Sequence, residues 1–239
     1  FSFSSIALAA APEIGGTVSS QAVDDTATIS PFSGVTISDA DGDNVTITIT
    51  LDDNSKGVLS GAGLSGTGPY TIALSAPAAA QSAIRALVFN PADNRVDVGL
   101  TETTVFTVEV ADGGAPVSDA STSVVSTSIN QLGTITLPTS VSQGQTLTAT
   151  VLDSDGVPAP ALISYAWEAD GSPVGADSNS YTLTQADVGK VVQVTASYTD
   201  LLNQAEVVAS NVTAAVGNTN DAPEIGGTVS SQAVDDTAT

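Results

Sequence analysis

The stretch Ala11-Pro-Glu-Ile-Gly-Gly-Thr-Val-Ser-Ser-Gln-Ala-Val-Asp-Asp-Thr-Ala-Thr28 occurs twice in this chain of 239 residues, because the same 18 residues return without a change at positions 222–239. The two copies begin 211 residues apart, which is 222 minus 11. Identity that extends over surface positions indicates a recent duplication within a tandem array. Solenoid units run from about 20 to 50 residues, so a period of this length must contain whole domains.

The sequence between the two copies has the pattern of half-buried strands. Apolar residues make up 41% of the chain, and Thr and Ser fill many positions between Val, Ile and Leu. This alternation is typical of strands with one buried and one solvated face. All-β units often close at around 100 residues, and a single core stops growing near 250 to 300. We therefore predict an all-β chain of two tandem antiparallel β-sandwich domains, one at 11–130 and one at 131–217. Residues 1–10 would form an N-terminal segment, and residues 218–239 a linker and the first strand of the next repeat.

Turn residues divide each predicted sandwich into short strands, with Gly, Pro, Asn and Asp between the apolar runs. One Ala-rich segment, 77–86, is compatible with either a short helix or a covering loop. The strands predicted for the first sandwich are 34–38, 45–51, 70–74, 86–89, 105–110 and 123–129. Those predicted for the second are 134–137, 146–152, 164–169, 180–183, 191–199 and 206–215.

The charge balance excludes two classes of partner. There are 26 acidic residues against four basic ones, so the formal net charge is −22. Phosphate binding is supplied largely by Lys and Arg, so we expect no nucleic-acid partner, and an anionic membrane surface is disfavoured for the same reason. No apolar run approaches the roughly 20 residues needed to cross a bilayer, which predicts no membrane insertion.

The chain contains neither cysteine nor methionine. Sandwiches outside the cell that lack disulfides need another means of stiffening, and a bound metal is the obvious substitute. Self-repulsion at this net charge also favours cations that neutralise it. The lack of Met, at position 1 as elsewhere, indicates a fragment or a processed product.

Asp39, Asp41 and Asp43 place three carboxylates within five residues. Two such charges 4 Å apart repel by about 1 kcal/mol in water and about 4 kcal/mol at an effective dielectric of 20. A hard divalent cation turns that repulsion into binding, and Ca²⁺ suits carboxylate and carbonyl oxygens on an irregular loop better than Mg²⁺ does. The alternative is a plain turn, because Asp and Gly are favoured in turns. The same two interpretations stay open for Asp153 and Asp155, which form a second acidic turn.

Three motifs carry a resemblance to a known family. Asn218-Thr-Asn-Asp-Ala-Pro-Glu224 looks like a linker between cadherin-like domains, and Ser38-Asp-Ala-Asp-Gly-Asp-Asn44 looks like their acidic loop. Ala111-Asp-Gly-Gly-Ala-Pro116, followed by a strand-like run, resembles the late part of the same repeat. The first predicted domain thus resembles the cadherin-like repeats of large bacterial RTX-type adhesins.

That resemblance implies Ca²⁺ at the junctions of successive domains. Asn218, Asn220 and Asp221 of a linker would meet an acidic loop such as that at Asp39 in the domain that follows. Glu102, which precedes a strand-like run, resembles the Glu that the domain body supplies. The segment Ser5-Ile-Ala-Leu-Ala-Ala10 stands before the first copy and lacks the Asn-Thr-Asn-Asp stretch found before the second. The linker ligands of the first junction are therefore missing from this sequence.

The second predicted domain resembles the immunoglobulin-like repeats of the same adhesins. The motifs are Tyr165-Ala-Trp-Glu-Ala-Asp-Gly171 and Tyr181-Thr-Leu-Thr-Gln-Ala-Asp-Val-Gly-Lys190. The immunoglobulin pattern carries a Cys pair packed on its Trp, which this chain lacks. Tyr165 and Trp167 lie two apart on a strand and share a face, so we expect them to pack in a core.

The resulting hypothesis is a non-enzymatic structural repeat of a secreted protein at the bacterial cell surface, a calcium-rigidified spacer in cell adhesion or biofilm formation. Its partners would be neighbouring repeats of the same protein. One alternative is a self-assembling extracellular filament joined head to tail by strand complementation. Another is a carbohydrate- or protein-binding module, which predicts an exposed aromatic platform. An enzyme is disfavoured, because no His exists to serve the many Ser and Thr hydroxyls as a base.

Overall fold

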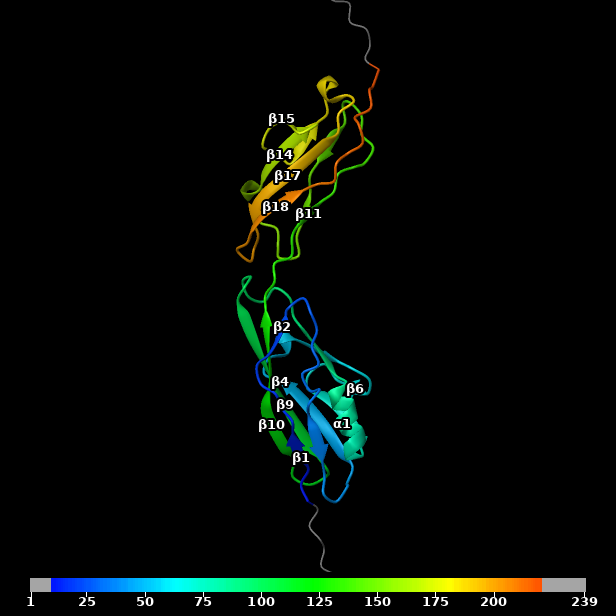
Figure 1. The fold of residues 1–239 in the computed structure, drawn as a ribbon, viewed down its shortest axis with the longest axis vertical. Helices are drawn as coiled ribbons and strands as arrows, with labels where there is room; N and C mark the ends of the chain where they lie inside the picture. The colour runs from blue at the N-terminus through cyan, green and yellow to red at the C-terminus, as the bar shows by residue number, and fades with distance from the viewer. Residues whose placement is uncertain (1–9, 221–239) are drawn as a thin grey trace, which may run out of the picture. The chain divides into compact units, whose positions relative to one another are not determined.

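The computed structural model describes residues 10–220. Its contacts define two compact units. The first holds the described residues up to Thr134 together with Val151–Ile163 and Ser197–Val207, and the second holds Ile135–Thr150, Ser164–Ala196 and the described residues from Val208 onward. Nearly all regular structure is β, which confirms the predicted fold class (Figure 1).

Residues 11–130 form one six-stranded sheet, two strand pairs and a helix. The sheet has the order β2-β10-β9-β4-β7-β6, and β1 pairs with β3 and β5 with β8. All of these pairs are antiparallel except β2 with β10, which is parallel. The elements are β1 Glu13–Gly15, β2 Gln21–Asp24, β3 Thr36–Ser38, β4 Val45–Leu51, β5 Gly57–Ser60, β6 Leu64–Ser65, β7 Tyr70–Ser75, α1 Pro77–Arg85, β8 Val88–Pro91, β9 Thr101–Ala111 and β10 Val117–Thr127.

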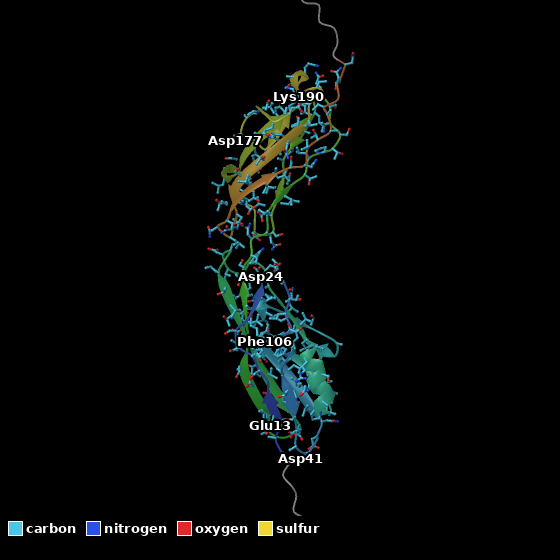
Figure 2. All side chains as sticks on the ribbon, in the orientation of Figure 1. Glu13, Asp24, Asp41, Phe106, Asp177 and Lys190 are labelled. Carbon is cyan, nitrogen blue, oxygen red and sulfur yellow. The ribbon has the colours of Figure 1, made fainter. Side chains whose placement is uncertain are left out.

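Alternation in β4 sets the core of this sandwich. The strand reads Val-Thr-Ile-Thr-Ile-Thr-Leu, and its four apolar residues are buried. Ile47 pairs with Val110 and Ile49 with Val108, so the buried faces of β4 and β9 coincide. Phe106 on β9, labelled in Figure 2, packs edge-on against two other phenylalanine rings, with centroid distances of 5.3 Å to Phe32 and 5.0 Å to Phe89. These contacts join the sheet to the segments that cover it.

The Ala-rich segment, for which the sequence left two interpretations open, forms helix α1. Pro77 occupies the first turn, where its missing N–H costs nothing. Ala80 and Ile84, four residues apart, are fully buried and therefore lie on one face of the helix. The Gln81 side chain accepts a hydrogen bond from the Ile37 backbone N–H at 3.0 Å, which ties α1 to β3.

Residues 131–217 have the strand order of an immunoglobulin-type sandwich. One sheet has the order β15-β14-β17-β18, and the pairs β12-β16 and β11-β13 supply the remaining strands. Trp167 on β14 is 1% exposed, and its indole N–H donates to the Ser178 carbonyl at 2.8 Å. The elements are β11 Thr134–Ile135, β12 Thr146–Thr148, β13 Val151–Leu152, β14 Ser164–Ala169, β15 Ser172–Val174, β16 Ser180–Thr182, β17 Val192–Thr199 and β18 Ala205–Ala209.

Trp167 packs on a hydrogen-bonded corner instead of on a disulfide. Its ring centroid lies 5.7 Å from that of Tyr181, whose hydroxyl donates to the buried Asp187 carboxylate at 2.8 Å. The same carboxylate accepts hydrogen bonds from the backbone N–H and the hydroxyl of Thr184. Burial opposes ionisation of Asp187, but the bonds from Thr184 and Tyr181 lower its pKa. Burial and the bond to Asp187 raise the pKa of Tyr181 to about 12.

Within residues 10–220, no helix is long and apolar enough to cross a membrane.

Replacing Asp187 tests this corner. Asp187→Ala leaves the buried Tyr181 hydroxyl without its acceptor, so we expect a loss of roughly 2–3 kcal/mol in the free energy of unfolding at neutral pH. Because the pKa of Asp187 is lowered in the folded state, its contribution is fully present above the ordinary value of 3.8 and is lost as the pH falls through the lower value. Urea unfolding followed by Trp167 fluorescence should show the difference between wild type and variant narrowing in acid. A constant difference across the pH range would contradict this role.

Candidate metal sites

The acidic loop between β3 and β4 is built as a turn around Asp39. One oxygen of the Asp39 carboxylate, Oδ1, accepts hydrogen bonds from the backbone N–H groups of Asp41 at 3.0 Å and Asp43 at 3.1 Å. Gly42 has a φ of 75°, a conformation that glycine adopts without strain. The other oxygen, Oδ2, is buried and has no partner. Turn formation thus uses one oxygen of Asp39 and leaves the second one available to a cation, so this side chain fits a Ca²⁺ ligand.

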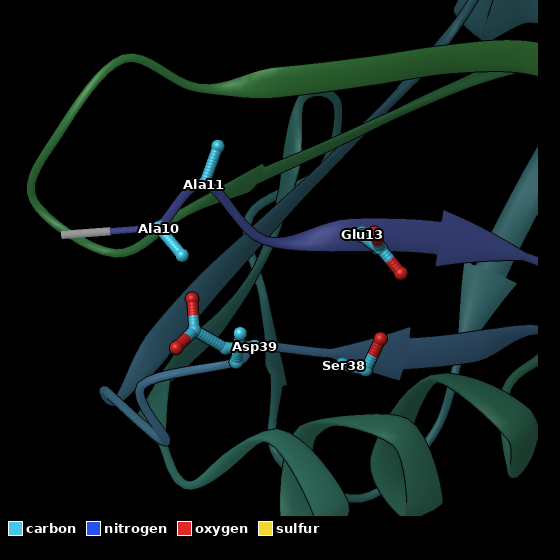
Figure 3. A pocket seen from close by; sticks show the side chains of 6 residues that line it. Ala10, Ala11, Glu13, Ser38 and Asp39 are labelled. Carbon is cyan, nitrogen blue, oxygen red and sulfur yellow. The ribbon is translucent and has the colours of Figure 1, made fainter.

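A small hollow lies next to this loop. It is lined by Ala10, Ala11, Glu13, Ser38, Asp39 and Ala40, and Figure 3 shows the Asp39 carboxylate pointing toward Ala10. The backbone N–H of Ala10 donates to Oδ2 of Asp41. Sequence reasoning missed Glu13, which β1 places opposite Ser38. The sequence could have pointed to Glu13, because this residue belongs to the repeated Ala-Pro-Glu motif.

Glu102 does not lie near the acidic loop. The end of β9 at Ala111 pairs with Thr46, next to the loop, whereas Glu102 stands nine residues earlier in β9 and pairs with Ser126. Nine residues of strand span about 30 Å. Figure 2 shows Glu13 and Asp41 at one end of this sandwich and Asp24, on the strand that pairs with the end of β10, at the other.

Both carboxylate oxygens of Glu102 are already bound. Oε2 accepts from Arg95 Nε at 2.6 Å and Oε1 from Arg95 Nη2 at 3.1 Å. The pKa of Arg95 is raised, chiefly by this bond. The structure therefore separates Glu102 from Asp39, Asp41 and Asp43, and no single site within this sandwich joins them.

Of the predicted linker ligands, the structure describes Asn218 and Asn220 but not Asp221. Asn218 and Asn220 follow β18 and are exposed, and the Asn218 side-chain oxygen lies 3.5 Å from Gln185 Nε2, which donates to it. Asp221 and the second copy of the repeated stretch lie outside the described residues. Their meeting with the acidic loop of a following domain stays a prediction.

The second acidic turn is also formed. Asp153 accepts the Asp155 backbone N–H through Oδ1 at 2.8 Å and the Tyr198 hydroxyl through Oδ2 at 2.6 Å. Asp155 is 3% exposed, and its Oδ2 accepts the Gln131 backbone N–H at 2.7 Å. Burial, and then the negative charges of its acidic neighbours, raises the pKa of Asp155.

Within residues 10–220, no three side chains of the His, Cys, Asp or Glu type converge on one point as they would around a bound ion. The metal-binding role of Asp39, Asp41, Asp43, Glu102, Asn218, Asn220, Asp153 and Asp155 stays a prediction.

Comparison with known proteins adds little beyond this geometry. No protein-family model matches the chain, and no curated protein matches it in sequence. Among solved structures, it is similar to the four N-terminal immunoglobulin domains of Dscam1 isoform 9.44, with 12% identity and a TM-score of 0.30 over 88% of this chain and 46% of that one. It is also similar to titin domains A168–A170, with 13% identity and a TM-score of 0.27 over 87% of this chain and 67% of that one. The chain spans less than half the length of the Dscam structures it matches. At such TM-scores the assignment of the fold rests on the strand order.

Two replacements of Asp39 separate its two roles. Asp39→Asn keeps an oxygen that can accept from Asp41 and Asp43, so we expect the free energy of unfolding in chelator to change by less than about 0.5 kcal/mol. Asp39→Ala removes that acceptor and should cost about 1 kcal/mol. Thermal unfolding in the presence of chelator measures both. Equal losses in the two variants would contradict the turn described above.

Proposed function

We propose that the chain is a non-enzymatic structural repeat of a long secreted bacterial surface protein, in which it serves as a calcium-rigidified spacer in cell adhesion or biofilm formation. Neighbouring repeats of the same protein are its partners. The 18-residue identity at an offset of 211 residues supports the array, because each period then holds two whole sandwiches.

The position of Ala10 carries the calcium part of this proposal. At the offset of 211 residues, Ala10 corresponds to Asp221, the last residue of the Asn-Thr-Asn-Asp linker. Ala10 lines the hollow beside Asp39. In an array whose internal units carry that linker, an aspartate would therefore enter the hollow next to the unpartnered Oδ2 of Asp39. Carboxylates that gather in this way repel one another unless a cation lies between them.

The charge of the chain supports the same conclusion. Within residues 10–220, the ion pairs are Lys56 with Asp52 and Arg95 with Asp53 and Glu102. None of these pairs involves the acidic loop at Asp39. A Ca²⁺ ion is the neutralising partner that extracellular conditions supply.

Calcium removal tests the spacer. With free calcium about a hundredfold above the dissociation constant, one site stabilises the folded state by about 2.7 kcal/mol. We expect a higher melting temperature and a longer, less variable hydrodynamic shape in calcium than in chelator, measured by calorimetry and small-angle X-ray scattering. Magnesium at the same ionic strength is the control. Identical values in calcium and chelator would refute the proposal.

Restoring the linker residue gives a gain-of-function test. Ala10→Asp adds a carboxylate beside Asp39 and Asp41, so we expect it to lower stability in chelator and to tighten calcium binding by about tenfold, since ligand charge sets the affinity of such sites. Ala10→Asn has nearly the same size without the charge and should gain less. Calorimetric titration measures both affinities. An unchanged or weaker affinity in Ala10→Asp would count against a site in the hollow.

A filament is the second candidate, and the pairing of the first copy favours it. Its residues form β1 and β2, which pair with β3 and β10, and Ile14 packs against the core. The second copy has the same residues and the same capacity to pair with another chain. Light scattering separates the two functions, since a spacer stays monomeric whereas a filament grows with concentration.

A binding module receives less support. The aromatic side chains among residues 10–220 are all buried or half-buried, so the described surface offers no stacking platform of the kind that this alternative predicts. The absence of His from the sequence supports a non-enzymatic role.

A further inference from the structure

A second set of oxygen atoms lies in the first compact unit, apart from the acidic loop. It involves the segments Val151–Ile163 and Ser197–Val207 and the residues around Asn130. Asp155 and Asp200 are only 3% and 4% exposed. Each has one carboxylate oxygen that is buried without a hydrogen-bond partner, Oδ1 of Asp155 and Oδ2 of Asp200. An orphaned acceptor at this depth is rare and requires an explanation.

Backbone hydrogen bonds hold both carboxylates in place. Oδ2 of Asp155 accepts from the Gln131 N–H at 2.7 Å. Oδ1 of Asp200 accepts from the N–H groups of Leu202 and Gln204, both at 2.8 Å. In each case the fold commits one oxygen and leaves the other in a fixed orientation with nothing to bind.

Two amide side chains present the same arrangement. The Asn130 nitrogen donates to Glu206 at 2.8 Å, and the Asn94 nitrogen donates to the Ser154 carbonyl at 2.7 Å. The side-chain oxygens of both asparagines are buried and unpartnered. Each amide nitrogen is thus held by a hydrogen bond, and the side-chain oxygen is the atom left without a partner.

Short backbone links bring these four residues together. Asn130 is adjacent to Gln131, which bonds Asp155, and Asn94 bonds Ser154, which is also adjacent to Asp155. On the other side of Asp155, the Leu201 N–H donates to the Gly156 carbonyl at 3.3 Å, and this places Asp200 beside the same turn. Burial is the largest cause that raises the pKa of Asp155, and the negative charges of Asp153, Asp200 and Asp25 raise it further. The ion pairs of residues 10–220 involve none of these acids.

We propose that a hard divalent cation, Ca²⁺, binds here through the unpartnered oxygens of Asp155, Asp200, Asn130 and Asn94. Two carboxylate and two amide oxygens on irregular segments suit Ca²⁺, which fills its remaining positions with water, better than Mg²⁺, which demands near-ideal octahedral geometry. The set has only two carboxylates, which explains why the described residues hold no group of three acidic ligands.

Two further residues, Asp153 and Glu206, position the ligands without binding the ion. Asp153 holds the Asp155 backbone N–H and the Tyr198 hydroxyl with its two oxygens. Glu206, 1% exposed, accepts from Asn130 and from the Gly133 N–H, and thereby orients the Asn130 amide. This site is separate from the acidic loop at Asp39, and it does not depend on the role of the chain as a spacer.

Two nearly isosteric variants test the site. Asp155→Asn and Asp200→Asn each keep the oxygen that accepts the backbone N–H and replace the unpartnered oxygen with an amide nitrogen. Both are made in the Asp39→Asn background, which removes one of the three carboxylates of the acidic loop, so that the loop contributes less to the calcium response. We expect calorimetry to find calcium bound in the 10⁻⁴ to 10⁻³ M range of extracellular modules, and each variant to weaken it at least tenfold.

Stability in chelator provides a readout that a merely structural role would not give. Each variant removes a buried charge from a set that lacks a cation, so it should be as stable as its parent without calcium, or more stable. The control is Asp170→Asn, an exposed position outside the set whose Oδ1 accepts the Val191 N–H. It should leave calcium binding unchanged.

Carbon-13 NMR of the Asp155 and Asp200 carboxyl groups decides the outcome even if a variant fails to fold. Calcium-dependent shifts of both signals support the site. Signals that stay unchanged up to about 10 mM calcium, above the range of extracellular modules, overturn it, because no calcium would then bind next to these carboxylates. If these signals fail to shift in a chain that keeps Asp39, while calcium still raises the melting temperature of that chain, this site is refuted and the spacer proposal stands.

Discussion

Carboxylates without cationic partners are the constraint on which this structure depends. With 26 acidic residues and four basic ones, ion pairs can satisfy only a few of them. The buried acids are held by backbone N–H groups: Asp25 by Ile129 and Asn94, Asp187 by Thr184, and Asp200 by Leu202 and Gln204. Such hydrogen bonds offset part of the loss of water around a buried carboxylate and fix the loop that donates them. In these sandwiches, which contain no cysteine, hydrogen-bonded carboxylates thus hold loops in place as disulfides do in many small domains.

Strands with a clear alternation could be predicted from the sequence, but several of the predicted bounds differ from the structure. The run predicted at 146–152 forms two short strands, β12 and β13, and the run predicted at 206–215 forms a strand, β18, that ends at Ala209. Strands β4 and β14 have the predicted limits, 45–51 and 164–169. Strand β5 was missed because its four residues begin at Gly57, and glycine is typical of turns. Strand β15 was missed because it contains Pro173, and proline disfavours a strand. The helix α1 could not be distinguished from a loop, because Ala carries little periodicity. Burial of Ala80 and Ile84, a tertiary contact, decides in favour of the helix.

The candidate sites, like the strands, could be predicted where their residues are close in sequence and not where they are far apart. The acidic loop could be predicted because its three aspartates are close in sequence, and proximity in sequence guarantees proximity in space. Glu102 was predicted by analogy of motif, and the register of β9 and β10 places it at the far end of the sheet from that loop. Asp200 and Asn130 were missed for the opposite reason. They are separated from Asp155 by 45 and 25 residues, and only the folded backbone brings them to one turn.

The two interpretations of an acidic turn, as a turn and as a metal ligand, describe the same side chain. Asp39, Asp155 and Asp200 each use one oxygen to accept a backbone N–H and keep the other free of partners. The hydrogen bond that makes the turn also fixes the direction of the second oxygen, so a cation meets a ligand that is already ordered. Little conformational entropy is then lost on binding. An ion that binds these oxygens would stabilise the folded state by mass action, by an amount that grows with the logarithm of its concentration once that exceeds the dissociation constant.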